Sequence, residues 1–123
     1  MFDINNVNQT TLDFFREIEN IGAGHAATAL SVMTGRPITI SVPRAQLCGY
    51  NEITHIMNGP ENVVVGLLVG ISDDLRGFIL LVLDLNDARM LVSTLLGEPI
   101  ENVSEDGAFS EMQVSALCEV ANI

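Results

Sequence analysis

Residues 10–35 read TTLDFFREIENIGAGHAATALSVMTG and have the features of one long helix. Thr10 and Asp13 form a capping-box pattern, in which each side chain can accept a hydrogen bond from a backbone N–H group of the first turn. Gly35 is expected to end the helix, because glycine readily takes the left-handed conformation found just after helices. Apolar residues recur between these ends at helical spacing on two faces. We therefore predict a helix over 10–35 that is largely buried.

The residues after this helix predict an antiparallel β-sheet. Apolar and polar residues alternate over 38–42, which predicts a strand, and a weaker strand is predicted over 53–57. Aliphatic and β-branched runs at 63–71 and 77–85 flank the mostly acidic residues 72–76, a pattern typical of a β-hairpin with a solvated loop.

Two further helices are predicted in the second half of the chain. One begins near 84–87 and ends at Gly97. The other begins at Ser110, where Gln113 completes a capping box, and is still running at Ile123. The predicted fold class is therefore α+β, with an antiparallel β-sheet packed against helices.

The chain is strongly acidic. Its 123 residues, enough for a single domain over 1–123, hold 16 Asp and Glu against five Arg and no Lys, a net charge of −11. This charge repels phosphate backbones and anionic lipid heads, so we expect neither nucleic-acid binding nor membrane insertion. The acidity is greatest in the C-terminal third, which favours a partner that presents Lys or Arg.

The cysteines and the apolar runs indicate in which cellular compartment the chain is expected. Cys48 and Cys118 belong to no pattern with metal-ligand spacing and are predicted to be reduced packing residues. The longest apolar runs are too short to span a bilayer, and no basic leader precedes an apolar stretch at the amino terminus. We expect a cytoplasmic protein.

The most specific feature of the sequence is an internal repeat. Each copy has a short polar residue, a Glu four positions on, and an Asn three positions after that. The first polar stripe is Asp13, Glu17 and Asn20, and the second polar stripe, 102 residues further on, is Ser115, Glu119 and Asn122. At about 100° per residue, the three positions of each stripe fall within about 60° of one another on a helix.

Gly22 and Gly24 interrupt the first helix beside its polar stripe. Each costs about 1 kcal/mol relative to alanine in a helix, so they indicate either tight helix packing or a functional surface. Gly24 continues the first polar stripe by one turn, where the absence of a side chain would let another backbone or side chain come close. The glycines do not follow a predicted strand, which argues against a nucleotide-binding loop.

These residues resemble a known family. The stretch from Glu17 to Ser31, with Pro43 downstream, is similar to the amino-terminal signature of the CheC chemotaxis phosphatases, which are related to CheX and FliY. The resemblance covers essentially the whole chain and includes both polar stripes. It departs from the family pattern at Glu19, which projects away from the stripe, and at His25, which we expect to be a buried imidazole on the apolar face.

The resemblance implies an activity and a set of site residues. CheC-like enzymes hydrolyse the aspartyl phosphate of the response regulator CheY, which brings its own Mg²⁺, so this chain needs no metal or cofactor of its own. The family pattern assigns Asn20 to position the attacking water and Glu17 to contact the regulator's lysine. The second stripe implies the same roles for Asn122 and Glu119. Flanking contacts are implied for Asp13, Ser115 and Gly24.

The resemblance also implies an architecture and leaves an alternative function open. Family members form a pseudo-symmetric fold, and this chain would hold its first half plus the first helix of the second. We therefore expect a weakened second site and self-association as a homodimer that replaces the missing half. The alternative is a non-catalytic binding module that docks the deamidase CheD or a flagellar switch component.

Overall fold

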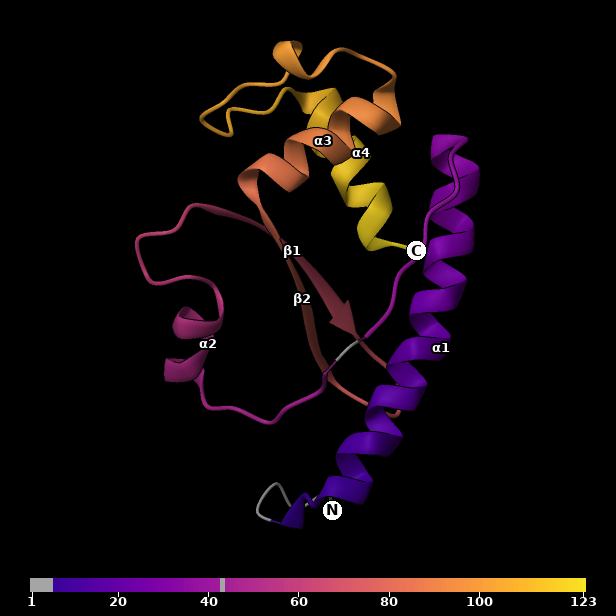
Figure 1. The fold of residues 1–123 in the computed structure, drawn as a ribbon, viewed down its shortest axis with the longest axis vertical. Coiled ribbons are helices and arrows are strands. Elements are labelled where there is room, and N and C mark those ends of the chain that lie inside the picture. Colours follow the sequence, from indigo (N-terminus) through magenta and orange to yellow (C-terminus); the bar gives the residue numbers. More distant parts are fainter. Residues whose placement is uncertain (1–5, 43) are drawn as a thin grey trace. The chain divides into compact units, whose positions relative to one another are not determined.

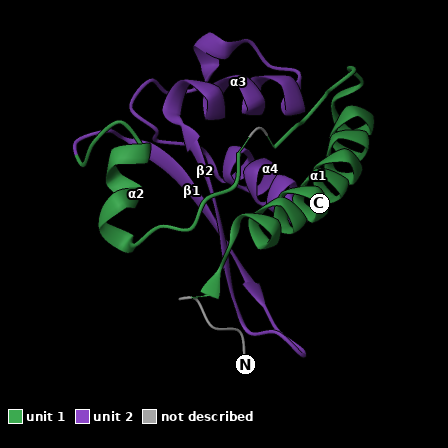
Figure 2. Ribbon diagram, turned by 60° about the horizontal axis from the view of Figure 1, so that its bottom comes forward, with its two compact units in different colours: residues 1–60 green, residues 61–123 purple. Residues whose placement is uncertain are grey.

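The structure, a computed structural model, describes residues 6–42 and 44–123. The chain divides into two compact units, residues 1–60 and 61–123, which Figure 2 colours separately. Their elements, labelled in Figure 1, are α1 (Gln9–Thr34) and α2 (Tyr50–Ile56) in the first unit and β1 (Val64–Ile71), β2 (Gly77–Asp84), α3 (Leu85–Leu96), η2 (Ile100–Asn102) and α4 (Glu111–Ala121) in the second. The α+β fold class is confirmed, and the single domain stays a prediction. Among the described helices, none has both the length and the hydropathy of a bilayer span.

Helix α1 is the long helix expected from the sequence. Its N-cap is Asn8, whose Oδ1 accepts the Thr11 N–H at 3.0 Å. The predicted start at Thr10 is wrong, because Asn8 supplies the capping oxygen two residues earlier and draws Thr10 into the first turn. Gly35, at φ 65°, ends the helix as predicted.

The burial predicted for α1 is wrong. The buried side chains of α1 are Ala27 and Leu30, while Phe14, Ile18 and Ile21 are largely exposed. Helical periodicity identifies an apolar face but does not supply the neighbouring element that covers it.

Residues 36–42 turn back and run beside α1 as an extended segment (Figure 1). The strand predicted over 38–42 is wrong, because its backbone donors bond to helix side chains and not to a second strand. The Ile38 N–H donates to Ser31 Oγ at 2.9 Å, and the Val42 N–H donates to Asn20 Oδ1 at 2.7 Å. Pro43 lies outside the described residues.

The weaker strand predicted over 53–57 is also wrong, because these residues lie in and just after α2. The Glu52 side chain reaches back to accept the Gly49 N–H at 2.9 Å, and the Glu52 N–H donates to the Gly49 carbonyl at 3.0 Å. These two bonds satisfy backbone groups at the start of the helix and favour the helical conformation over an extended one.

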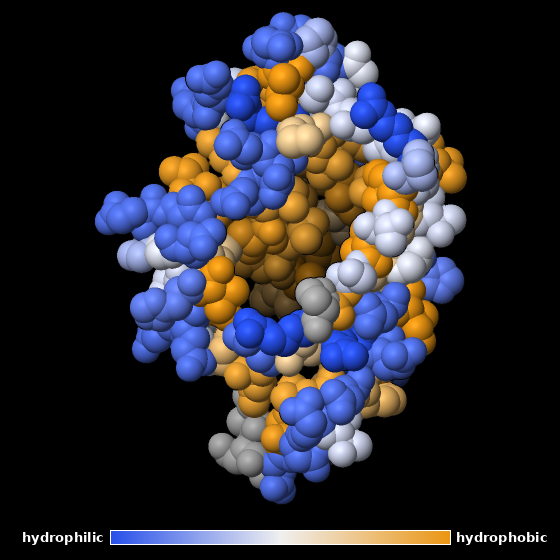
Figure 3. Space-filling view, viewed as in Figure 1, coloured by the Kyte–Doolittle hydropathy of each residue, from blue (hydrophilic) through white to orange (hydrophobic). Residues whose placement is uncertain are grey.

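The hairpin predicted in the second unit is confirmed. Strands β1 and β2 pair antiparallel, with Leu67 opposite Leu81 and Leu68 opposite Leu80. Val65 and Leu67 face the core of the unit, whereas Leu68 and Leu80 on the other face are exposed. Figure 3 shows apolar side chains gathered over the strand pair.

The helices of the second unit pack on the inner face of this hairpin. Val92 of α3, Val103 and Leu117 of α4 form the core, and Arg89 anchors the chain before α4 by donating to the Val103 carbonyl at 3.0 Å. The predicted end of α3 at Gly97 is confirmed by the left-handed φ of 65° at that residue.

The capping box predicted at the start of α4 is confirmed. Ser110 Oγ accepts the Gln113 N–H at 3.2 Å, and Gln113 Oε1 accepts the Ser110 N–H at 2.9 Å. The other end of the Gln113 amide is buried and donates to Glu98 Oε1 at 2.8 Å. Helix α4 ends at Ala121 and does not continue to Ile123 as predicted, because the Asn122 N–H closes a tighter turn onto the Glu119 carbonyl at 3.1 Å.

Candidate functional site

The first polar stripe lies along the exposed side of α1. Asp13 and Glu17 are exposed, and Asn20 is half-buried one turn further on. Asp13 Oδ1 accepts a hydrogen bond from the Gln9 side-chain amide at 2.9 Å. The stripe therefore offers two carboxylates to solvent and one amide that is partly enclosed.

The Asn20 side chain is held by the chain itself. Its Oδ1 accepts the Val42 N–H at 2.7 Å, across 22 residues of sequence. A carbonyl oxygen has two lone pairs and an amide nitrogen two protons, so this bond occupies one acceptor position and leaves three hydrogen-bonding positions on Asn20. An amide fixed in this way can accept from and donate to a water without changing its own protonation.

Gly22 and Gly24 have open space around them. A Cβ atom built on either residue would meet no described atom within 4 Å, apart from the helix's own nearby backbone. Within the described residues of the first unit, neither glycine therefore packs tightly against another element. His25, expected to be buried, is exposed, because no described element covers that face of α1 at this level.

The second polar stripe lies on α4. Ser115, Glu119 and Asn122 are all exposed, and Asn122 is the C-cap of the helix with φ −90° and ψ −1°. Its backbone N–H is bonded to the Glu119 carbonyl, one turn back. The two stripes thus differ in their support, since the Asn20 amide is tied to a distant backbone group and Asn122 lies at the end of its helix.

An open groove of about 550 Å³ runs between β1 and α4 beside the second stripe. It is lined by Gly66–Gly70, Val114, Cys118, Ala121 and Asn122. Within residues 6–42 and 44–123, no three His, Cys, Asp or Glu side chains converge in an arrangement suited to a metal ion.

Sequence reasoning missed two residues of the first site, Val42 and Ser31. Val42 contributes a backbone N–H group, which has no signature in the sequence. Ser31 is one of several short polar residues in α1, and nothing in the spacing marks it as the acceptor for Ile38. Both hydrogen bonds depend on the path of the segment 36–42 beside α1, which the sequence does not indicate.

Known proteins resemble this chain along nearly its whole length. Residues 12–46 match the model of the CheC-like family. CheY-P phosphatase CheC of Bacillus subtilis is 32% identical over 97% of this chain and 56% of its own length. The chain is therefore similar to proteins of the CheC and FliY family. The flagellar motor switch phosphatase FliY of Bacillus subtilis is 25% identical over 98% of this chain and 30% of its own length.

The fold agrees with this CheC and FliY relationship. The crystal structure of Thermotoga maritima FliY matches 95% of this chain with a TM-score of 0.78 and 28% identity, over 57% of the FliY chain. A putative CheY-P phosphatase, CheC1 of Halobacterium salinarum, is 29% identical over the full chain and 58% of its own length. The chain thus spans about half the length of the CheC proteins that it matches. The part matched by the CheC-like family model contains the first polar stripe and Val42 but not the second stripe.

Proposed function

We propose that this chain carries a phosphatase site for the aspartyl phosphate of a CheY-type response regulator. The observation that carries the proposal is the fixed Asn20 amide, one turn from the exposed carboxylate of Glu17 on an open helix surface. The names of the related proteins support the substrate, since CheC is a CheY-P phosphatase and FliY a motor switch phosphatase. Such a reaction belongs in the cytoplasm, where response regulators act.

The reaction requires this chain only to position the attacking water and the docked regulator. A water oxygen attacks the phosphorus in line, the bond from phosphorus to the regulator's aspartyl oxygen breaks, and inorganic phosphate and a carboxylate result. The regulator brings the Mg²⁺ that offsets charge on the phosphoryl oxygens. Asn20 would hold the water in line, which is a role for a positioned amide in phosphoryl transfer. Because Val42 already fixes the Asn20 amide, little orientation remains to be lost when the regulator docks.

Glu17 would orient the docked helix by a charge-assisted hydrogen bond to the regulator's active-site lysine. The absence of lysine from this chain allows a direct test. A zero-length carbodiimide reagent joins carboxylates to amines, so a link between a side-chain amine and Glu17 has to come from the partner. We expect a cross-link from Glu17 to the regulator's lysine, lost in Glu17→Gln and kept in Glu19→Gln. A cross-link to the regulator that is equally strong in Glu17→Gln would count against this role of Glu17.

The second stripe would act as a weaker copy of the site. Asn122 lies in the final turn of α4, where helix ends fray, and its support is a single local turn. Asp13, Ser115 and Gly24 would be flanking contacts to the regulator. The first site should therefore dominate the activity of this chain.

The test is release of phosphate from phosphorylated regulator. We expect Asn20→Ala to lower kcat by about 100-fold, the order expected for loss of positioning, and Asn122→Ala to lower it less. The double variant should retain only the regulator's own rate. Circular dichroism checks that each variant keeps its helices. Equal activity in all three variants and the unmutated protein would overturn the mechanism.

A binding role is the second candidate, and the Val42 bond is also the observation that favours it. An asparagine whose oxygen accepts a backbone N–H can tie a segment to a helix without taking part in a reaction. In that case the chain would dock CheD or a flagellar switch component without releasing phosphate. Binding to an immobilised partner that is unchanged in Asn20→Ala, with no phosphate release by the unmutated protein, would select this role.

A further inference from the structure

Asn20 and Ser31 lie on one face of α1 and bond to the same edge of the segment 38–42. Eleven residues separate them, which places them within about 20° of one another and about 16 Å apart along the helix. Ile38 and Val42 are four residues apart in an extended segment, which spans about 13 Å. The spacing of the two backbone donors is therefore within about 3 Å of the spacing of the two helix residues, and both hydrogen bonds are made.

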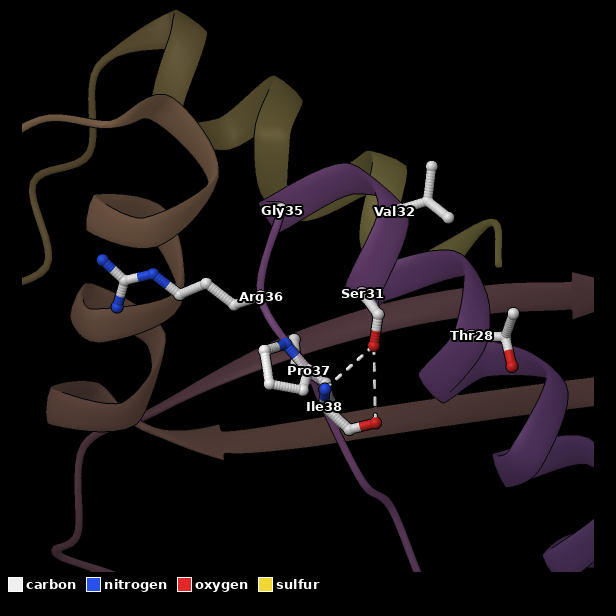
Figure 4. Close-up of a pocket in the computed structure, with 7 residues that line it drawn as sticks. All are labelled: Thr28, Ser31, Val32, Gly35, Arg36, Pro37 and Ile38. Atoms are coloured by element: carbon white, nitrogen blue, oxygen red, sulfur yellow. Dashed lines mark hydrogen bonds between the residues drawn. The ribbon is translucent and has the colours of Figure 1, made fainter.

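Ser31 is half-buried, and its hydroxyl both donates and accepts a hydrogen bond. Its Oγ accepts the Ile38 N–H at 2.9 Å and lies 2.7 Å from the Ala27 carbonyl, to which the hydroxyl donates. Figure 4 shows the side chain aimed at the Ile38 backbone, at the edge of an open depression formed where the chain turns at Gly35. Ala27, which lies between Asn20 and Ser31 on this face, is small and buried, so the backbone can come close.

The two bonds are coupled by the geometry of an extended chain. Successive backbone N–H groups point to opposite edges, so a slip of one residue would turn the donors at 38 and 42 away from α1. The Ser31 bond thus sets the register in which the Val42 N–H meets Asn20. Without it, the Asn20 amide keeps its rotamer freedom and its oxygen loses a fixed partner.

We propose that Ser31 is a positioning residue for Asn20, acting through the segment 38–42. The inference rests on the proposed function of Asn20, but its structural half can be measured without activity. Ser31 is about three helical turns from Asn20 and holds no part of the proposed docking surface.

The experiment compares Ser31→Ala with Thr28→Ala. Thr28 is a matched control, because its hydroxyl donates to the Gly24 carbonyl at 3.1 Å, as the Ser31 hydroxyl does to Ala27, but bonds to no backbone donor of the segment 36–42. Both changes favour the helix by propensity. In Ser31→Ala we expect hydrogen exchange at the Val42 amide to rise about tenfold and the side-chain amide signals of Asn20 in NMR spectra to move. In Thr28→Ala neither should change.

Phosphate release gives the functional readout. Ser31→Ala should lower kcat about tenfold and leave KM nearly unchanged, and Ser31→Thr, which keeps the hydroxyl, should restore both kcat and the Val42 protection. If Ser31→Ala loses helix content, Ser31→Val against Ser31→Thr gives the same comparison with equal shape. Unchanged Val42 exchange in Ser31→Ala, or disturbed Val42 with unchanged kcat, overturns the proposal.

Failure of the proposed function gives a different result. If the unmutated protein releases no phosphate, the phosphatase role is wrong. The NMR and exchange data still decide whether Ser31 positions Asn20. In Ser31→Ala, faster Val42 exchange and shifted Asn20 signals would support that role, and unchanged exchange and signals would refute it.

Discussion

Gly22 and Gly24 offer a matched pair of substitutions that separates helix stability from docking. Both lie inside α1 with ordinary helical backbone, and a Cβ on either would enter open space among the described atoms. Gly24 lies about 40° from Asn20 around the helix, and Gly22 about 160° from it. An added methyl group therefore does the same to the helix at both positions but reaches the first polar stripe at only one.

The stability effect follows from propensity. Gly→Ala in an exposed helix interior contributes about 1 kcal/mol, because the unfolded chain loses conformational freedom and no clash offsets the gain. With a urea dependence of about 1–3 kcal/mol per molar, each variant should raise the midpoint of α1 unfolding by about 0.3–1 M. Urea titration followed by far-ultraviolet circular dichroism measures this shift.

The activity effect should appear in one variant. If the regulator docks on this face as proposed, a methyl group at Gly24 would overpack the contact, at a cost of about 1–3 kcal/mol, which corresponds to a loss of about 5- to 150-fold in kcat/KM. Gly22→Ala should keep its kcat/KM. A lower urea midpoint in Gly24→Ala would refute the open space around Gly24. An equal kcat/KM in Gly22→Ala and Gly24→Ala would refute docking of the regulator on this face.

Other predictions concern the second unit and assembly. Leu117 is 2% exposed, so Leu117→Ala should lower the free energy of unfolding by about 2–5 kcal/mol. Met112 is 69% exposed, so Met112→Ala should leave the urea midpoint of unfolding nearly unchanged. Hydrogen bonds from Ser104 and the Ala108 N–H lower the pKa of Asp106, so the stability from its ionised form is complete above the unfolded pKa and is lost as pH falls through the lower folded pKa. NMR titration should find that low pKa, and Ser104→Ala should raise it toward the ordinary value. The apolar outer face of the hairpin should support self-association, and light scattering that finds only monomer at high concentration would contradict it.

Signals that depend on neighbouring residues were predictable from the sequence. The left-handed glycines at Gly35 and Gly97 and the capping box of Ser110 and Gln113 all act within one helical turn. The hairpin was predictable for the same reason, because two β-branched runs around a short acidic loop need no distant partner to pair. The placement of the first polar stripe on one helix also followed from periodicity, whereas Asn122 of the second stripe is the residue just after α4.

Features that depend on distant partners were not predictable. The alternation over 38–42 is real, but its backbone donors bond to Asn20 and Ser31, which lie 22 and seven residues away from their partners in the sequence. The exposure of His25 is a second example, because a helix face becomes core only where another element covers it. For the candidate site, the sequence indicated Asn20 but not the backbone group that fixes its amide.

The way in which α1 holds the segment 38–42 also affects how this region can vary. Both bonds are made to backbone N–H groups, which every residue type except proline provides. In a randomised library, positions 38 and 42 should accept many side chains, while positions 20 and 31 should be restricted to short residues that accept hydrogen bonds. Mutational tolerance would then be high at positions 38 and 42 and low at positions 20 and 31, although both sets of residues form the same two hydrogen bonds.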